Sequence, residues 1–316
     1  MMLAQCFLLL LCLPSFATAL LPPPFVNYRP IIGVLAQQSE TPDLPGDTYI
    51  NAEYIKFLEF AGARVVPILV SKPASYYKAI FSKINGVLFP GGSVDETRSP
   101  YALAGRILYD LAIQAIDNGD YFPLWGTCLG FQFLACATAN TNFLNHTDSY
   151  NMTLPLQLSQ DYKNSRMFGT APESVMMYLM NEAVTENFHH DSVLLNRFLN
   201  DPKLTSFYRL LSYNGDRRGV HFVSTFEAFD YPIYGSQWHP EVVLFGWATD
   251  HDITHSLHAI AVSQYIANFF VTEARRNKHR FTDPEDEANS MIEKHRLFYL
   301  NDGTYVQRYY FNSTHN

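Results

Sequence analysis

Apolar and polar residues follow two different patterns along the first half of the chain. Short apolar runs have the length and composition of buried strands, and they occupy residues 30–36, 64–70 and 86–89 and the run that begins at residue 122. Amphipathic segments with helical periodicity lie between them, at residues 49–61, 75–84 and 101–118. Strands that alternate with helices in this way form βαβ units with right-handed crossovers. The predicted fold class is therefore α/β, with a doubly wound and mostly parallel sheet flanked by helices.

The second half of the chain is more polar, and its pattern is less regular. Residues 140–163 are rich in Asn and Thr, which indicates a surface insertion or an exposed hairpin. The remaining predictions are helices at residues 171–179 and 253–276, a polar loop at 182–190, strands at 204–213 and 219–228, and a C-terminal strand or arm at 298–311. No change of composition marks a linker. We therefore interpret residues 20–316 as a single domain with a C-terminal extension from about residue 277.

The strand predicted from residue 122 leads into a Gly-x-Cys-x-Gly sequence that continues as an apolar, helix-like segment. Cys128 lies at the apex, between Gly126 and Gly130. In a nucleophile elbow of this kind, the glycines allow a strained turn, and the free N–H groups and positive end of the following helix favour a thiolate. The alternative is a buried cysteine between two loop glycines, because free cysteines are often buried.

A second glycine turn, Pro90-Gly-Gly-Ser93, follows the strand predicted at residues 86–89. Sites in parallel sheets form at the carboxyl ends of the strands, so this turn and the Cys128 elbow are expected to face one crevice. Glycines let a backbone N–H approach a substrate oxygen closely, which an oxyanion hole requires. Taken alone, a Gly-Gly turn after a strand is more often an ordinary turn.

A candidate general base lies in the segment Gln237-Trp-His-Pro-Glu241. In extended backbone, His239 and Glu241 point to the same face, and Pro240 stiffens the chain between them. A carboxylate beside an imidazole fixes its tautomer and supports the imidazolium that forms when it takes a thiol proton. The alternative is a solvated strand end. The hypothesis of a Cys–His enzyme therefore depends on the cysteine, the glycine turn and the histidine together.

Composition excludes several other functions. The 316 residues are 47% hydrophobic and 16% charged, with a formal charge of −8 and neither acidic blocks nor basic clusters. This composition gives no indication of a nucleic-acid or membrane partner. His189 and His190 are adjacent rather than at ligand spacing, and the cysteines stand singly, so we expect no metal site.

The first nineteen residues are interpreted as a cleaved secretory signal. Residues 6–13 form an apolar run too short to span a bilayer, and Ala17-Thr-Ala19 offers small residues for cleavage. A structural helix here would be followed at once by the helix-breaking Leu20-Leu-Pro-Pro-Pro24. Potential glycosylation sequons of the secretory pathway begin at Asn145, Asn151 and Asn312.

Removal of the signal leaves Cys128 and Cys136 as the cysteines of the mature chain. On a continuous helix, eight residues at about 1.5 Å each separate them by roughly 12 Å. Bridged Cα atoms must lie within about 7 Å, so a disulfide between the two is not expected. Cys136 lies on the apolar side of the predicted helix and is interpreted as buried.

The motifs Pro90-Gly-Gly-Ser93, Gly126-Thr-Cys-Leu-Gly-Phe-Gln132 and Gln237-Trp-His-Pro-Glu241 occur in an order that resembles the class I glutamine amidotransferase superfamily. Residues 29–37 and 49–67 and the run Asn187-Phe-His189, behind a secretory signal, are similar to the gamma-glutamyl hydrolases, peptidases of folate polyglutamates. The resemblance extends from about residue 29 to residue 276. It implies a flavodoxin-like fold. No ATP-site motif follows His239, so a free-standing hydrolase fits better than an ammonia-channelling module.

The resemblance also implies roles for individual residues. Cys128 is expected to be the nucleophile, His239 the general base and later acid, and Glu241 the residue that orients the imidazole. The backbone N–H groups of Gly92 and Leu129 are expected to form the oxyanion hole, and the substrate-binding residues are expected to be Gly91, Ser93, Gln132 and His189. The implied substrate is a folyl or antifolate poly-γ-glutamate, with no cofactor and no metal. The implied location is the secretory pathway, in the lysosome or outside the cell.

Two other functions remain open from the sequence. One is the hydrolysis of other γ-glutamyl amides or peptides within the same superfamily. The other is a secreted protein that binds γ-glutamyl ligands without catalysis, against which the intact Cys128, His239 and Glu241 argue. The sequence also leaves open the choice between endo and exo cleavage and the oligomeric state, including a homodimer.

Overall fold

The computed structural model of the chain describes residues 26–39, 45–248, 251, 253–300 and 305–312. The predicted signal at residues 1–19 lies outside these residues. The central sheet has eight strands in the order β4-β1-β5-β6-β12-β11-β10-β8. Its strands are β1 (Ile31–Leu35), β4 (Arg64–Ile68), β5 (Val87–Phe89), β6 (Leu124–Thr127), β8 (Gln157–Leu158), β10 (Tyr208–Gly215), β11 (His221–Ala228) and β12 (Ile233–Ser236).

The first five strands of that order, β4 to β12, run parallel to their neighbours. The last three are added antiparallel. Parallel strands with helices on both faces are apolar throughout, and β1 and β5 are buried at every residue. The predicted α/β class with a mostly parallel sheet is confirmed.

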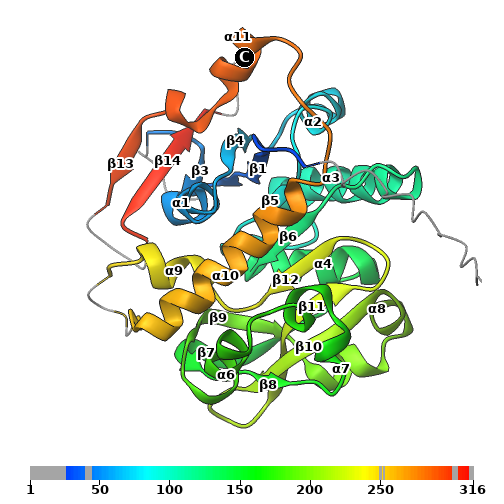
Figure 1. Cartoon of the computed structure of the whole chain (residues 1–316), viewed down its shortest axis with the longest axis vertical. Helices are drawn as coiled ribbons and strands as arrows, with labels where there is room; N and C mark the ends of the chain where they lie inside the picture. The colour runs from blue at the N-terminus through cyan, green and yellow to red at the C-terminus, as the bar shows by residue number, and fades with distance from the viewer. Residues whose placement is uncertain (1–25, 40–44, 249–250, 252, 301–304, 313–316) are drawn as a thin grey trace, which may run out of the picture.

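Helices cover both faces of the sheet (Figure 1). Alternate residues of β1 show the two cores: Ile31 and Leu35 belong to one, and Ile32 and Val34 belong to the other. The first core includes α2 (Ala74–Phe81), α3 (Pro100–Asp117), α4 (Leu129–Ala139), α7 (Leu195–Asn200) and α8 (Pro202–Phe207). The second includes α1 (Ala52–Phe60), α5 (Arg166–Gly169), α6 (Glu173–Asn181), α9 (Pro240–Phe245) and α10 (Leu257–Ala274).

Two small sheets flank the central one. The first has the order β13-β14-β3-β2, and its strands are β2 (Gln37–Gln38), β3 (Thr48–Asn51), β13 (Leu297–Tyr299) and β14 (Gln307–Phe311). The C-terminal strand β14 pairs antiparallel with β3, so this strand lies beside the start of α1 (Figure 1). Between α10 and β13 lie α11 (Pro284–Ser290) and the short 3₁₀ turn at Ile292–Lys294. The strands predicted within residues 298–311 are thus present.

The second small sheet corrects one prediction. The segment 182–190 is not a loop, because β9 (Thr185–Val193) pairs antiparallel with β7 (Leu144–Leu154). The polar composition suggested a loop, but Thr147, Ser149 and Ser192 are buried and their hydroxyls bond to one another. The hairpin predicted within residues 140–163 is also wrong, because β7 pairs with β9 and β8 pairs with β10 rather than with each other.

Two element boundaries also differ from the prediction. Residues 49–51 belong to β3 rather than to the helix that follows, because they pair with β2 and β14 before α1 begins at Ala52. Residues 204–207 belong to α8 rather than to a strand, because the Asp201 side chain accepts hydrogen bonds from Lys203 and Leu204 and caps that helix. No helix within the described ranges is both long enough and apolar enough to cross a bilayer.

Candidate active site

The predicted sharp turn from strand to helix is present at Cys128. Strand β6 ends at Thr127, α4 begins at Leu129, and Cys128 between them has φ 51° and ψ −106°. Such a backbone conformation is strained for a residue with a side chain. A Cβ on Gly130 would lie 2.0 Å from the Phe89 carbonyl oxygen, so only glycine fits there. The glycines therefore allow a turn that presents the thiol at the carboxyl end of the sheet.

Cys128 is held firmly in this position. Its backbone N–H donates to the Ser236 carbonyl of the neighbouring strand β12 at 2.9 Å, and its carbonyl accepts from the Gln132 N–H at 2.9 Å. The side chain is 4% exposed. Leu129 is the first residue of α4, where a backbone N–H has no acceptor within the helix. The thiol therefore lies at the positive end of a helix, beside donors that an oxyanion could use.

The His239–Glu241 pair is present, with His239 in extended backbone and Glu241 in the first turn of a helix. His239 is the N-cap of α9 and Pro240 is its first residue, a position that proline favours. The chain therefore enters a helix directly after His239, which corrects the expectation of a strand. In this first turn, Glu241 still reaches back to the imidazole, and His239 Nδ1 lies 2.7 Å from Glu241 Oε1. Both side chains are buried, at 4% and 1% exposure.

The electrostatic surroundings of His239 favour the imidazolium form. Burial alone lowers the pKa of the imidazole, but the charges of Glu241 and Cys128 and the hydrogen bond with Glu241 outweigh it and raise the pKa to about 10. Since Nδ1 faces Glu241, Nε2 is the ring atom left for the thiol. The group can therefore form a thiolate–imidazolium pair oriented by a carboxylate.

The Gly91-Gly92 turn lies against both residues, as the strand-end position predicted. A Cβ on Gly91 would lie 2.9 Å from His239 Cε1 and 3.3 Å from Cys128 Cβ. A Cβ on Gly92 would lie 1.9 Å from Gln37 Oε1, and Gln37 Nε2 donates to the Gly91 carbonyl at 2.8 Å. Any side chain in this turn would collide with the site. Ser93, the next residue, is exposed beside it.

Gln132 connects α4 to two neighbouring segments. Its Nε2 donates to the Asp191 carbonyl on β9 at 2.6 Å and to Gln237 Oε1 at 3.2 Å. The side chain is 5% exposed, one turn of helix beyond Cys128. These bonds tie the helix that carries the cysteine to the segment that leads to His239.

His189 lies on β9 and is 4% exposed. Its Nε2 is 3.1 Å from Asn187 Oδ1, and its Nδ1 is 3.0 Å from the hydroxyls of Ser149 and Ser192. An amide oxygen can only accept, so Nε2 carries the proton and Nδ1 accepts from the hydroxyls. Burial, with a smaller contribution from the charge of His239, lowers the pKa of His189 to about 3. The imidazole is therefore neutral, and its ring nitrogens are bonded within the sheet.

Two tyrosines complete the surroundings of the imidazole, and the sequence analysis assigned neither of them a role in the site. The Tyr54 hydroxyl accepts the Gly91 N–H at 2.9 Å and lies 2.9 Å from the Tyr305 hydroxyl. Tyr305 lies 2.9 Å from His239 Nδ1 and donates to Glu241 Oε1 at 3.0 Å. Tyr54 was predicted only as part of the apolar side of a helix, and the pattern of apolar residues carries no signal for the direction of its hydroxyl.

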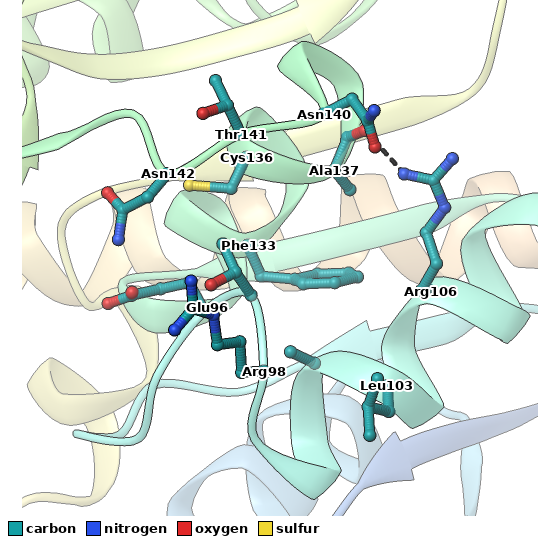
Figure 2. A pocket seen from close by; sticks show the side chains of 12 residues that line it. Glu96, Arg98, Leu103, Arg106, Phe133, Cys136, Ala137, Asn140, Thr141 and Asn142 are labelled. Carbon is teal, nitrogen blue, oxygen red and sulfur yellow. Dashed lines mark hydrogen bonds between the residues drawn. The ribbon is translucent and has the colours of Figure 1, made fainter.

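A separate cavity of about 480 Å³ lies near the other end of α4 (Figure 2). Its lining includes Glu96, Arg98, Arg106, Phe133 and Cys136, and neither Cys128 nor His239. Burial raises the pKa of the Cys136 thiol to about 12. Both Cys128 and Cys136 are free thiols. The expectation that Cys136 is buried and that the two form no bridge is confirmed.

Among the described residues, no group of three or more His, Cys, Asp or Glu side chains is arranged to hold a metal ion. The groups that the structure brings together at this site are the thiol, the imidazole, the carboxylate and the backbone N–H groups around them.

Comparison with known proteins agrees with the resemblance drawn from the motifs. The model of the family Peptidase C26 matches residues 30–241. Human gamma-glutamyl hydrolase is 40% identical over 284 residues, which cover 89% of each protein, and the rat gamma-glutamyl hydrolase is 41% identical over 286 residues, which cover 90% of each. The solved structure of PurLQS from Thermotoga maritima is 15% identical, with a TM-score of 0.46, and the match covers 76% of this chain and 99% of that one. This chain is a peptidase that belongs to the Peptidase C26 family.

Proposed function

We propose that the protein hydrolyses γ-glutamyl bonds of folyl and antifolate poly-γ-glutamates through a thioester on Cys128. The observation that carries the mechanism is the position of Cys128 on a strained elbow beside a buried His239–Glu241 pair. The human and rat gamma-glutamyl hydrolases, with which the chain shares about two residues in five over nine tenths of its length, support γ-glutamyl bonds as the target. The folyl part of the proposal rests on the resemblance of residues 29–37 and 49–67.

The first step is the attack of the Cys128 sulfur on the γ-carbonyl carbon of a glutamyl residue. The thiol proton resides on His239 Nε2, because Glu241 accepts the proton on Nδ1 and supports the positive ring. The carbonyl oxygen becomes negative as the C–S bond forms. The N–H groups of Gly92 and Leu129, one on the glycine turn and one at the start of α4, are the donors for that oxygen.

The second step breaks the C–N bond. The imidazolium gives its proton to the departing α-amine of the next glutamate, which leaves as a neutral amine, and a γ-glutamyl thioester remains on Cys128. His239 then takes a proton from water, whose oxygen attacks the thioester carbon. The C–S bond then breaks, which releases the carboxylic acid and restores the thiolate–imidazolium pair.

We also propose supporting roles for the residues around this centre. Gly91 and Ser93 belong to the turn beside the nucleophile, and a substrate chain that enters the crevice passes them. Gln132 and His189 are buried beneath the site and bonded to its walls, which supports a role in keeping the shape of the substrate site. His189 is neutral, so it adds no charge to the site.

The proposed location is the secretory pathway, in the lysosome or outside the cell. The side chains of Asn145, Asn151 and Asn312 are exposed, as glycan attachment requires. Mass spectrometry of the protein from a secreting cell, before and after glycosidase treatment, tests occupancy of these three sites. Unmodified peptides at all three, together with an uncleaved N-terminus, would contradict this location.

The central test is the hydrolysis of a defined pteroyl-pentaglutamate by wild type, Cys128→Ala and Cys136→Ala, with products identified by mass spectrometry. We expect Cys128→Ala to lose turnover by a factor of about 10⁴ or more, as loss of a nucleophile does. Cys136→Ala removes a free thiol of the same helix and should retain turnover. Turnover at the wild-type rate in Cys128→Ala would end the proposed mechanism, and turnover of small γ-glutamyl amides in place of the pentaglutamate would change the substrate class.

A further inference from the structure

Tyr305 reaches the catalytic pair from a part of the chain that the family model does not match. That match ends at residue 241, whereas Tyr305 lies between β13 and β14 in the C-terminal extension. Its hydroxyl lies within 3.0 Å of Glu241 Oε1, His239 Nδ1 and the Tyr54 hydroxyl. One side chain from the extension therefore contacts three groups around the proposed general base.

The direction of each hydrogen bond follows from the number of protons available. The Gly91 N–H can only donate, so the Tyr54 oxygen accepts from it. The carboxylate oxygen of Glu241 can only accept, so the Tyr305 hydroxyl donates to it. Tyr305 then has no proton left for Tyr54, and the Tyr54 hydroxyl must donate to the Tyr305 oxygen. The result is a one-way chain from Gly91 through both tyrosines to the carboxylate.

Both hydroxyls keep their protons at acidic and neutral pH. Burial, with the charges of Glu241 and Cys128, raises the pKa of Tyr54 far above its ordinary value. Burial, with the same charges and that of Tyr54, does the same for the pKa of Tyr305. Glu241 Oε1 therefore receives two donors, the Tyr305 hydroxyl and the N–H at His239 Nδ1.

The backbone around Tyr305 is held at several points. Strand β14 pairs with β3, directly before the helix that carries Tyr54. Arg308 Nε donates to Asn51 Oδ1 at 2.7 Å, and Lys56 bonds to the Gln307 side chain. The rings of Tyr54 and Tyr305 have centroids 5.8 Å apart. The pairing of β14 and the neighbouring Tyr54 ring thus hold the Tyr305 hydroxyl at the carboxylate.

We propose that Tyr305 is a positioning residue for catalysis. It holds the Glu241 carboxylate in the orientation that aligns His239 with Cys128, and it connects that carboxylate through Tyr54 to the Gly91-Gly92 turn. This role depends on the proposed Cys–His mechanism. It makes the C-terminal extension part of the catalytic apparatus, because the extension supplies one of the two donors to the orienting carboxylate. Tyr305 acts through Glu241 and does not contact the reacting atoms.

The matched pair of variants is Tyr305→Phe and Tyr310→Phe. Both remove one hydroxyl from a tyrosine of the extension, and the Tyr310 hydroxyl is buried without a hydrogen-bond partner among the described residues. We expect Tyr305→Phe to lower kcat about 10-fold with KM within about twofold, as loss of a hydrogen bond to a charged group does. Tyr310→Phe should keep the wild-type kcat and KM. Equal thermal midpoints for the two variants would show that Tyr305→Phe is folded.

The pH profile separates positioning from a structural role. The ionisable groups that surround the imidazole are Cys128, Glu241, Tyr54 and His189, and Glu53 lies close enough to Glu241 to feel its charge. The charge of Glu241 helps to raise the pKa of His239 to about 10, and Tyr305→Phe removes a donor that holds this carboxylate in place beside the imidazole. The alkaline limb of the kcat profile should therefore move to lower pH in Tyr305→Phe and stay in place in Tyr310→Phe.

A double-mutant cycle with Glu241→Gln tests whether the effect of Tyr305 passes through Glu241. If Tyr305 acts through Glu241, then Tyr305→Phe should have little further effect on kcat in the Glu241→Gln background. A second loss of about 10-fold in that background, or an unchanged kcat and pH profile in Tyr305→Phe alone, would overturn the proposal. Failure of the underlying mechanism would show separately, as an active Cys128→Ala enzyme.

Discussion

Glu53 is a buried carboxylic acid whose ionisation should destabilise the fold at alkaline pH. The residue lies in the first turn of α1, is 0% exposed, and has neither carboxyl oxygen within hydrogen-bonding distance of a described partner. Burial, with a smaller contribution from the charge of Glu241, raises the pKa of Glu53 from 4.5 to about 7, although Lys56 and nearby backbone N–H groups oppose the shift. Glu53→Gln removes this ionisation while keeping the size and shape of the side chain.

The sign of the pH dependence follows from the raised pKa. Below pH 4.5, Glu53 is protonated in the folded and the unfolded chain, so its ionisation costs nothing. Between pH 4.5 and about 7 the unfolded chain loses this proton while the folded chain keeps it, so the free energy of unfolding falls as the pH rises. At 1.36 kcal/mol for each pKa unit, the loss is on the order of 3 kcal/mol once the pH exceeds 7.

The assay is reversible urea unfolding of wild type and Glu53→Gln from pH 4.5 to pH 8. The difference in unfolding free energy, Glu53→Gln minus wild type, should rise by about 3 kcal/mol across this range, because other groups titrate equally in both proteins. Burying the amide N–H donors of the new glutamine changes the free energy of unfolding by the same amount at every pH. It therefore does not affect how the difference between the two proteins varies with pH. Glu173→Gln, at an exposed carboxylate in the first turn of α6, is the matched control and should show a flat difference. A flat difference for Glu53→Gln would refute the assigned burial penalty.

Two further predictions concern the catalytic centre. His239→Ala should slow the alkylation of Cys128 by iodoacetamide, because the variant lacks the imidazolium that stabilises the thiolate. The alkylation rate should fall more at pH 6 than at pH 9, and an equal fall at both pH values would contradict the ion pair. Gly91→Ala should lower kcat/KM at least 10-fold with the fold intact, because its Cβ would lie 2.5 Å from the Tyr54 hydroxyl and 2.9 Å from His239 Cε1. Retention of wild-type kcat/KM in Gly91→Ala would show that the turn can move away from the imidazole without loss of activity. Circular dichroism verifies the fold of His239→Ala and Gly91→Ala.

The central sheet and the elbow could be predicted from the sequence because their signals are local. An apolar run of strand length next to Gly-x-Cys-x-Gly permits few backbone conformations, and residues 30–139 fold much as their pattern predicts. The position of the Gly91 turn beside Cys128 followed from topology, since the carboxyl ends of neighbouring parallel strands lie at the same edge. Local pattern and connectivity were sufficient for both.

Polar strands were harder to predict, because their stability comes from partners far away in sequence. In β9, the buried His189 and Ser192 have hydrogen-bond partners on β7: Ser149, 40 residues away, lies 3.0 Å from His189 Nδ1, and the Thr147 hydroxyl bonds to Ser192. Hydrophobic periodicity contains no information on such bonds. The start of α9 was missed for a related reason: Pro240 fits both an extended strand end and the first turn of a helix, and tertiary packing selects the helix.

The role of Tyr305 lies furthest from prediction, because the residue follows its partner Glu241 by 64 positions and is in a segment without a recognised motif. Its hydroxyl, Glu53 and Glu241 nevertheless form one electrostatic unit around His239. Below pH about 7, Glu53 is neutral and does not repel the Glu241 carboxylate that supports the imidazolium. Above that pH, Glu53 adds a second buried negative charge close to Glu241, so we expect the fold around the catalytic pair to be more stable at acidic than at alkaline pH.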